Sequence, residues 1–286
     1  MSDVPAALDV IVVPHTHWDR EWYAPFQVYR RALVGVLADL LDRFDADPSA
    51  PAFTFDGQTA PLEDYLEVVP HDEARVRRYV EAGRLIVGPS YVQADQFLVS
   101  GEAFIRNFLA GLALAARFGP AMRLGYFPDT FGHVAQLPQL LRGFGFESVI
   151  FSRGMGDQGK HLGSEFIWRA PDGSEVLAIH EIGGALDRTS GYLNAALLGY
   201  PVLWSDDHGP FSLDVAAQHA RSLIERLCQF ARTPLLLFAN GGDHLGAQPE
   251  LRSTLAWLNS TSTGVRFKVG TFPEYVDRVV HSLHDR

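Results

Sequence analysis

The sequence predicts an α/β fold built around a parallel sheet of seven strands, with a β-hairpin inserted into it. Short, almost continuously apolar runs alternate with longer amphipathic stretches along the whole chain. Continuous apolar runs are typical of strands buried on both faces, and their alternation with helices indicates right-handed crossovers between parallel strands. The length of 286 residues, with 47% hydrophobic and 20% charged residues, suits one large folded domain.

Each element can be assigned to a segment. The apolar runs are expected to form strands at residues 8–13, 52–55, 85–87, 124–127, 149–151, 235–239 and 265–269. The amphipathic stretches are expected to form helices at residues 28–44, 62–69, 72–82, 103–118, 136–143, 215–231 and 250–258. Residues 165–169 and 176–180 flank an Ala-Pro-Asp-Gly turn and are expected to form the hairpin, as a flap inserted into the sheet. Residues 183–210 are expected to form a long functional loop. No linker, repeat or charge block divides the chain, so residues 1–286 are interpreted as one domain.

The composition limits the classes of partner. With 34 acidic against 24 basic side chains and a net charge of −10, the chain is not expected to bind nucleic acid, which requires a basic face. No window approaches 18 uninterrupted apolar residues, and the first ten residues do not resemble a signal peptide, so no membrane partner is expected. The single cysteine, Cys228, cannot form an internal disulfide. Together these features predict a cytoplasmic location.

Polar side chains gather where the predicted strands end. Every predicted strand except the last is followed directly by polar or ionisable residues. The carboxyl ends of parallel strands meet at one edge of a sheet, which is where α/β proteins place their sites. A catalytic face is therefore expected at this edge.

The segment after the first strand, HTHWDREW, predicts a metal site. His17 and Asp19 are two residues apart, so both side chains can face one cation on an extended loop. An imidazole nitrogen with a carboxylate oxygen suits zinc best, and manganese or nickel less well. The alternative is that Asp19 caps the next helix and His15 is packed in the core. Trp22 would supply an apolar wall on which a sugar ring can stack.

Two further carboxylates follow the fourth and sixth predicted strands. Asp129 comes directly after Pro128, which fixes the backbone as a nucleophile or metal ligand requires, although Asp129 could instead cap the next helix. Asp243 lies in the turn NGGDHLG, where it could face a ligand or form an Asx-type turn. Glycoside hydrolysis needs two such carboxylates, one as nucleophile or base and one as acid. Their separation decides between retention and inversion, and the sequence does not give it.

Five segments together resemble the N-terminal catalytic domain of the family 38 α-mannosidases, in particular the bacterial branch that includes mannosylglycerate hydrolases. In chain order they are HTHWDREWY (15–23), FTFDGQTAPLEDYLEV (53–68), GRLIVGPSYVQADQFLVSGEAFIRN (83–107), GYFPDTFGHVAQLPQLLRGFGF (125–146) and NGGDHLGAQPEL (240–251). The resemblance implies a seven-stranded β/α barrel and a retaining mechanism assisted by one zinc ion. The implied substrate is an α-mannoside, either an oligosaccharide or a mannosylglycerate-like molecule.

The same resemblance assigns roles to individual residues by motif. The nucleophile of the family also contacts the zinc ion, so one carboxylate serves in two roles. An aromatic floor and an arginine hold the sugar near that nucleophile. The implied metal ligands are His17, Asp19 and Asp129; the implied catalytic residues are Asp129 and Asp243; the implied substrate-binding residues are Trp22, Arg153 and Asp95.

One feature departs from the family pattern. The remaining zinc ligand of the family is a histidine in a His-Asp pair after the barrel, and neither His71-Asp72 nor His284-Asp285 stands at a suitable position. The downstream helical and β-sandwich domains are therefore expected to be absent, leaving three protein ligands, a number that is common in catalytic zinc sites. Two alternatives stay open. The chain could be a truncated or split module, inactive alone, that binds sugar or a partner chain supplying the helical region, or it could be a metal-dependent glycan deacetylase.

Overall fold

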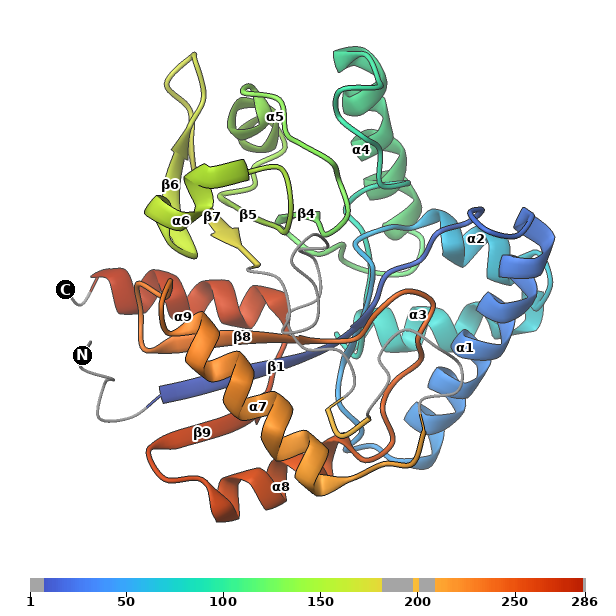
Figure 1. The fold of residues 1–286 in the computed structure, drawn as a ribbon. Coiled ribbons are helices and arrows are strands. Elements are labelled where there is room, and N and C mark those ends of the chain that lie inside the picture. The colour runs from blue at the N-terminus through green and yellow to red at the C-terminus, as the bar shows by residue number, and fades with distance from the viewer. Residues whose placement is uncertain (1–7, 182–197, 201–208, 285–286) are drawn as a thin grey trace.

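The structure is a computed structural model that describes residues 8–181, 198–200 and 209–284, so most of the expected loop at 183–210 lies outside the described residues. Strands and helices alternate along the chain (Figure 1). The strands are β1 (Leu8–Thr16), β2 (Phe53–Phe55), β3 (Leu85–Ile86), β4 (Gly125–Phe127), β5 (Ser148–Phe151), β6 (Glu165–Arg169), β7 (Glu175–His180), β8 (Leu235–Asn240) and β9 (Val265–Val269). The helices are α1 (Phe26–Ala46), α2 (Ala60–Leu66), α3 (Glu73–Glu81), α4 (Gly101–Ala115), α5 (Leu137–Gly143), α6 (Gly159–Leu162), α7 (Leu213–Leu227), α8 (Leu251–Thr261) and α9 (Phe272–His284), with short 3-10 helices η1 (Pro70–Asp72) and η2 (Gly156–Gln158).

The strands form two sheets in which most pairs are parallel. In the first sheet, β1 pairs in parallel with β8, β9 and β2, and β3 extends the sheet beyond β2. In the second sheet the order is β4-β5-β7-β6, and only β6 runs antiparallel to its neighbour. The apolar residues of β1 are buried along almost the whole strand, as its central place in the sheet requires. These pairings confirm the predicted α/β fold with a parallel sheet.

A closed seven-stranded barrel is not confirmed. Within the described residues, no strand pairing joins the two sheets. The sheets nevertheless enclose a common core, because Ile11 of β1, Ile150 of β5 and Leu237 of β8 pack in one cluster. Helix α9 packs into the same cluster through Phe272 and Tyr275, and the Tyr275 hydroxyl donates a hydrogen bond of 3.1 Å to a carboxylate on β6. This helix therefore connects the second sheet to the first through side-chain contacts.

The β6–β7 hairpin differs from the expected inserted flap. Its two strands pair antiparallel between the residues predicted for them. Strand β7, however, also pairs in parallel with β5, from Ser148 opposite Leu177 to Phe151 opposite His180. Residues 176–179 are apolar without interruption and buried, so this strand belongs to the sheet interior, and of the two hairpin strands only β6 lies at an edge.

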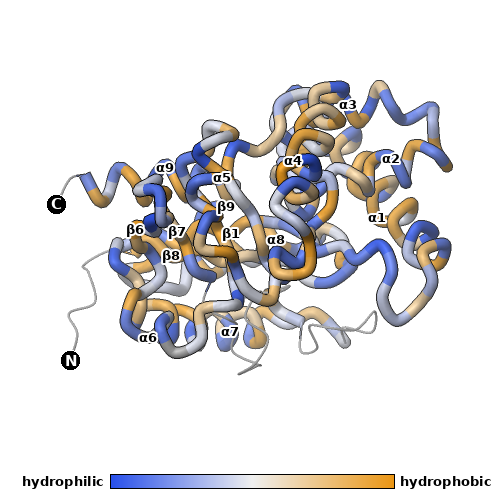
Figure 2. Tube along the Cα trace, turned by 90° about the horizontal axis from the view of Figure 1, so that it is seen from above, coloured by the Kyte–Doolittle hydropathy of each residue, from blue (hydrophilic) through white to orange (hydrophobic). Residues whose placement is uncertain are grey.

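The helices cover the sheets through their apolar faces. Leu223 of α7 and Leu255 of α8 pack against the first sheet, and Leu37 of α1 packs in a separate cluster with β2. Figure 2 shows apolar residues recurring along strands and helices alike.

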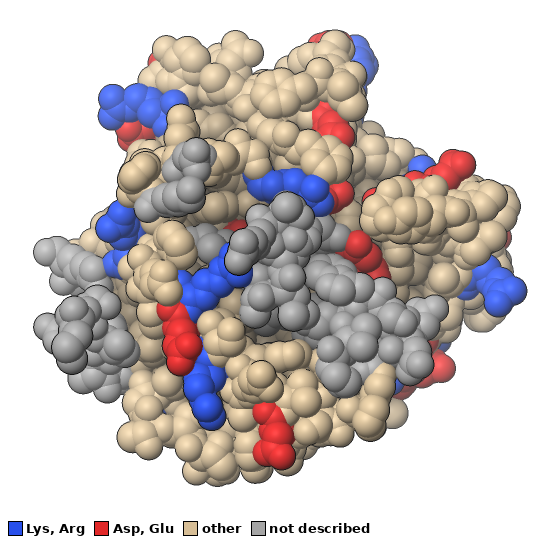
Figure 3. Space-filling view, in the orientation of Figure 1, with Lys and Arg blue, Asp and Glu red and all other residues tan. Residues whose placement is uncertain are grey.

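On the face shown in Figure 3, the basic and acidic side chains of the described residues are interspersed. None of the described helices has the length and apolar character needed to cross a membrane.

One carboxyl group in the core lies directly after β7 and makes the stability depend on pH. Glu181 is fully buried and accepts a hydrogen bond of 2.9 Å from the Ser152 hydroxyl. Burial raises the pKa of Glu181 to about 8, against an ordinary value of 4.5. The folded chain therefore keeps a proton on Glu181 that the unfolded chain releases above pH 4.5. The contribution of this proton to the stability of the fold is therefore fully present below pH 4.5, the pKa in the unfolded chain, and is lost as the pH rises through 8, the pKa in the folded chain.

The substitution Glu181→Gln should remove this part of the pH dependence. The free energy of unfolding of the wild type should fall, relative to that of Glu181→Gln, by up to about 2–3 kcal/mol between pH 5 and pH 7. Urea unfolding of both chains at the two pH values measures the difference. Parallel pH profiles for the two chains would contradict the assignment of a neutral Glu181.

Candidate active site

The residues singled out in the sequence line one cavity of about 780 Å³. It opens at the carboxyl ends of β1, β2, β4, β5 and β8, where the parallel strands bring their following loops together. The segments that supply its walls are far apart in the chain, from residue 17 to residue 243. The cavity contains all seven of the site residues predicted from the sequence, namely His17, Asp19, Trp22, Asp95, Asp129, Arg153 and Asp243.

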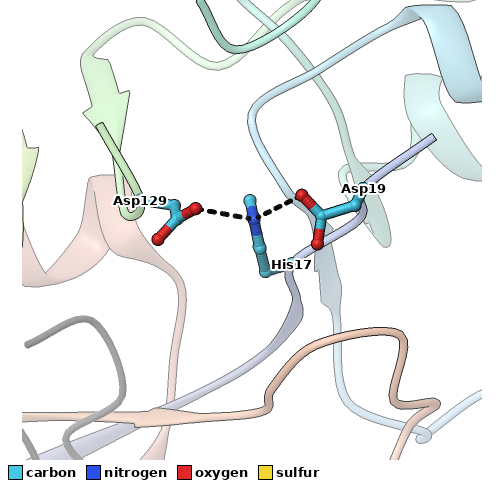
Figure 4. Close-up of side chains that lie close together, drawn as sticks. All are labelled: His17, Asp19 and Asp129. Atoms are coloured by element: carbon cyan, nitrogen blue, oxygen red, sulfur yellow. Dashed lines mark ion pairs between the residues drawn. The ribbon is translucent and has the colours of Figure 1, made fainter. Parts of the chain in front are cut away.

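His17, which lines this cavity, stands between two carboxylates (Figure 4). Its Nε2 atom lies 3.5 Å from Asp19 Oδ1 and 3.7 Å from Asp129 Oδ2. One ligand atom from each of the three residues falls within 4.8 Å of the other two. The structure thus brings together, from two distant segments, the three side chains that the resemblance implies as metal ligands.

The charges around His17 favour a positive charge at this point. Burial lowers the pKa of His17, but the nearby carboxylates of Asp56 and Asp19 outweigh this effect and raise it well above its ordinary value. Burial alone would raise the pKa of Asp19. Hydrogen bonds with His17 and His244 outweigh this effect, so the pKa of Asp19 is lowered. A cluster that stabilises a protonated imidazole among carboxylates can equally hold a metal cation in place of that proton.

The donor set fits zinc. Zinc in proteins binds imidazole nitrogen and carboxylate oxygen at about 2.0–2.2 Å. The three ligand atoms lie within 4.8 Å of one another, so they are almost close enough for one ion to bind all three at these bond lengths. Mg²⁺ and Ca²⁺ prefer sites made of oxygen ligands only, so the imidazole favours a transition metal.

Asp129 has the surroundings expected of a reactive carboxylate. Burial raises its pKa to about 6, while the positive charges of His17 and Arg153 act in the opposite direction. Arg153 donates a hydrogen bond to Asp129 Oδ1, and its guanidinium lies 4.4 Å from the ring centre of Phe131. The two carboxylate oxygens are therefore engaged differently, with Oδ1 toward the arginine and Oδ2 toward His17.

The structure excludes the helix-capping alternatives for both aspartates. Helix α5 begins at Leu137 with Gln136 at its cap position, well beyond Asp129. Helix α1 begins at Phe26 with Pro25 at its cap position, well beyond Asp19. Neither aspartate therefore caps these helices, and both line the cavity.

The loop after β8 is held against the end of β1. The backbone N–H of His17 donates to Gly242 O (3.0 Å), and the N–H of His244 donates to His17 O (2.8 Å). A Cβ atom on Gly241 would lie 2.0 Å from His15 O, so only glycine allows this close approach of the two backbones. The arrangement places Asp243 beside His17, near enough for its negative charge to raise the pKa of Asp129.

Trp22 and Asp95 lie at the rim of the cavity. The Trp22 ring is 53% exposed and stacks on the Tyr23 ring at a centroid distance of 3.9 Å. Asp95 Oδ1 accepts a hydrogen bond of 3.1 Å from the backbone N–H of Phe131, which follows Asp129 by two residues. Asp95 therefore holds the loop that carries Asp129, in addition to lining the cavity.

Three side chains near the site were given no role from the sequence. Asp56 accepts a hydrogen bond from His17 Nδ1, and His244 Nε2 accepts one of 3.1 Å from the Asp19 N–H. His133 bridges Gln96 and the carbonyl oxygen of Arg153 with hydrogen bonds of 3.1 and 3.0 Å. Each of them lies in the polar segment that follows a predicted strand, so this position is the only signal in the sequence that indicates them. Their contacts depend on backbone turns that the sequence pattern does not reveal.

Comparisons with known proteins agree with this geometry. Residues 7–286 match the model of the glycosyl hydrolases family 38 N-terminal domain. A protein of Halalkalibacterium halodurans named "Putative mannosylglycerate hydrolase" is 37% identical over 283 residues, which cover 95% of this chain and 30% of that protein. The human protein alpha-mannosidase 2C1 is 31% identical over 169 residues, which cover 57% of this chain and 16% of its own length.

A solved structure shares the fold over nearly the whole chain. The crystal structure of an alpha-mannosidase from Enterococcus faecalis V583 superposes with a TM-score of 0.82 at 29% identity, covering 96% of this chain and 29% of that one. The chain thus spans about a third or less of the length of these relatives. From the family match and the shared fold together, the chain belongs to glycosyl hydrolase family 38 and corresponds to its N-terminal domain.

Proposed function

We propose that this chain is the catalytic domain of a retaining α-mannosidase that hydrolyses α-mannosides with the assistance of zinc. The observation that supports it best is the approach of Asp129 to His17 and Asp19 in one cavity, with a second carboxylate, Asp243, beside them. The relatives named as mannosidases and as a mannosylglycerate hydrolase make an α-mannoside the expected substrate. An oligosaccharide and a mannosylglycerate-like molecule are the two substrate classes we consider.

The proposed reaction uses the two carboxylates in sequence. Asp129 attacks the anomeric carbon while Asp243 donates a proton to the departing glycosidic oxygen, so that a glycosyl ester forms and the aglycone leaves. Asp243 then takes a proton from a water molecule, which displaces Asp129 and releases mannose with its original anomeric configuration. A retaining mechanism requires carboxyl groups about 5–5.5 Å apart.

The remaining residues would hold the substrate and the ion. His17, Asp19 and Asp129 would bind zinc, which as a Lewis acid can hold two vicinal sugar hydroxyls and stabilise a distorted ring. Arg153 fixes one oxygen of Asp129 and thereby orients the other. The exposed Trp22 ring would form an apolar floor under the sugar. Asp95 would accept hydrogen bonds from the hydroxyl groups of the sugar, and it also holds the loop that carries Asp129.

The anomeric configuration of the first product tests this proposal. When the zinc-loaded chain hydrolyses an aryl α-mannoside, proton NMR should show α-mannose first, followed by slow mutarotation. The matching aryl β-mannoside is the control and should not be hydrolysed. Initial formation of β-mannose would contradict the retaining mechanism, and hydrolysis of neither substrate would contradict activity of the chain alone.

A second candidate function is a split module that needs a further polypeptide for activity. It is favoured by the count of three protein ligands in the described cluster and by the greater length of the relatives. In this case the chain would bind one zinc ion without hydrolysing mannosides, and a helical polypeptide supplied in trans would restore hydrolysis. Zinc stoichiometry and hydrolysis, measured on the same preparation, separate the two candidates.

A further inference from the structure

The carboxylate of Asp56 is fully buried behind His17, at the carboxyl end of β2. His17 Nδ1 lies 3.0 Å from Asp56 Oδ1 and 2.9 Å from Oδ2. Oδ2 also accepts hydrogen bonds from the Trp18 N–H (2.7 Å) and from Gln58 Nε2 (2.6 Å), and Oδ1 accepts one of 3.1 Å from Gln93 Nε2. A buried carboxylate is costly unless such donors surround it, and here three donors besides the imidazole hold it in one orientation.

The backbone at Asp56 is also unusual. Its φ angle of +52° lies in the left-handed region, which residues other than glycine rarely adopt. The following Gly57 has φ +59°, and a Cβ atom there would lie 2.8 Å from Tyr126 Cδ1. This turn points the carboxylate back toward β1 in place of continuing the strand. Strained non-glycine residues cluster at functional sites, where the surrounding contacts hold them in place.

The contact with Asp56 decides which nitrogen of His17 can bind a cation. A carboxylate only accepts hydrogen bonds, so Nδ1 must carry a proton to donate one. The other nitrogen, Nε2, faces Asp19 at 3.5 Å and Asp129 at 3.7 Å. Metal-bound histidines commonly donate their second ring N–H to a carboxylate, which fixes the tautomer and the orientation of the ring.

We propose that Asp56 is a positioning residue of the metal site. It acts through His17 by holding a proton on Nδ1 and by directing Nε2 to the cation that Asp19 and Asp129 share, and it does not touch the ion itself. The proposal rests on the metal site in the proposed function. It assigns a purpose to a buried charge and a strained turn that the hydrolytic steps do not use.

Zinc affinity tests this role independently of hydrolysis. Asp56→Asn keeps the size of the side chain but turns an amide NH₂ toward donors that already face both oxygens. The dissociation constant for zinc, measured by competition with a chromophoric chelator, should rise about 10–100-fold. Asp72→Asn is the matched control, because Asp72 is a buried carboxylate that pairs with Tyr65 and Arg75 away from the cavity. Its zinc affinity should equal that of the wild type.

A second measurement applies to the wild type, in case Asp56→Asn does not fold. In the zinc-loaded chain labelled with ¹⁵N-histidine, NMR should show a protonated Nδ1 and a zinc-bound Nε2 for His17. Zinc bound through Nδ1, or an unchanged zinc affinity in folded Asp56→Asn, would overturn the proposal. A wild-type chain that binds no zinc would overturn it too, whatever glycosides the chain hydrolyses. Zinc binding with the expected tautomer but without mannoside hydrolysis would contradict only the proposed function.

Discussion

Replacing Asp129 with asparagine is expected to reduce mannoside hydrolysis by a factor on the order of 10⁴ or more. An amide nitrogen or oxygen cannot replace the carboxylate as a nucleophile toward the anomeric carbon. The substitution also removes the ion pair with Arg153 and a charged ligand of the proposed zinc ion. The measured quantity is kcat for an aryl α-mannoside at saturating zinc.

The control for this substitution is Asp172→Asn. Asp172 lies in the exposed turn of the β6–β7 hairpin, where, among the residues that the structure describes, its carboxylate accepts hydrogen bonds from Ser174 alone. Its loss should leave kcat unchanged within a factor of about two, as expected for a surface substitution. Circular dichroism of both variants verifies the fold. If folded Asp129→Asn retained more than about a tenth of the wild-type kcat, the nucleophile would have to be another residue.

The substitution His17→Ala should abolish the response of the chain to zinc. A ligand that binds only the folded state at 100 times its dissociation constant stabilises that state by about 2.7 kcal/mol. For a chain of 286 residues, such a gain corresponds to a rise in Tm of about 4–5 °C. In His17→Ala the zinc affinity should fall by more than about 100-fold, since the loss of a direct ligand exceeds that of a supporting residue. Thermal unfolding with and without zinc measures both effects.

His71→Ala is the matched control for the zinc experiment. His71 also precedes an aspartate, in the sequence His71-Asp72, but its side chain is exposed on η1 and is not among the residues that line the cavity. Zinc should raise the Tm of His71→Ala as much as that of the wild type. An equal rise in the Tm of His17→Ala would show that zinc binds elsewhere on the chain. In the wild type, a chelator should reverse the rise in Tm that zinc produces.

The sequence is sufficient to predict that three aspartates come together, because the loops after parallel strands lie at one edge of the sheet. Asp19, Asp129 and Asp243 are separated by more than a hundred residues from one to the next, yet each follows a strand of apolar residues. The carboxyl ends of such strands lie along one edge, so their loops converge without any knowledge of the helices between them. The structure confirms this convergence in a single cavity.

Other features depend on contacts that no sequence pattern encodes. The continuous apolar run of β7 marks a buried strand, but only its pairing with β5 shows that it joins the sheet interior and does not form a flap. The role of Asp56 depends on a left-handed φ angle, which few residues other than glycine, asparagine and aspartate adopt and which no pattern in the sequence indicates at this position. The strands form two sheets with α9 packed in the core that they share, and neither arrangement follows from the order of the elements along the chain.

Covalent trapping tests the central claim, that Asp129 is the nucleophile of a retaining α-mannosidase, most directly. A fluorinated α-mannosyl fluoride forms a glycosyl-enzyme quickly and releases it slowly, so the intermediate accumulates. After incubation of the zinc-loaded chain, mass spectrometry of its peptides should find one glycosyl adduct, on the peptide that contains Asp129, and Asp129→Asn should carry none. An adduct on another carboxylate, or an unmodified chain that nevertheless hydrolyses mannosides, would contradict the account.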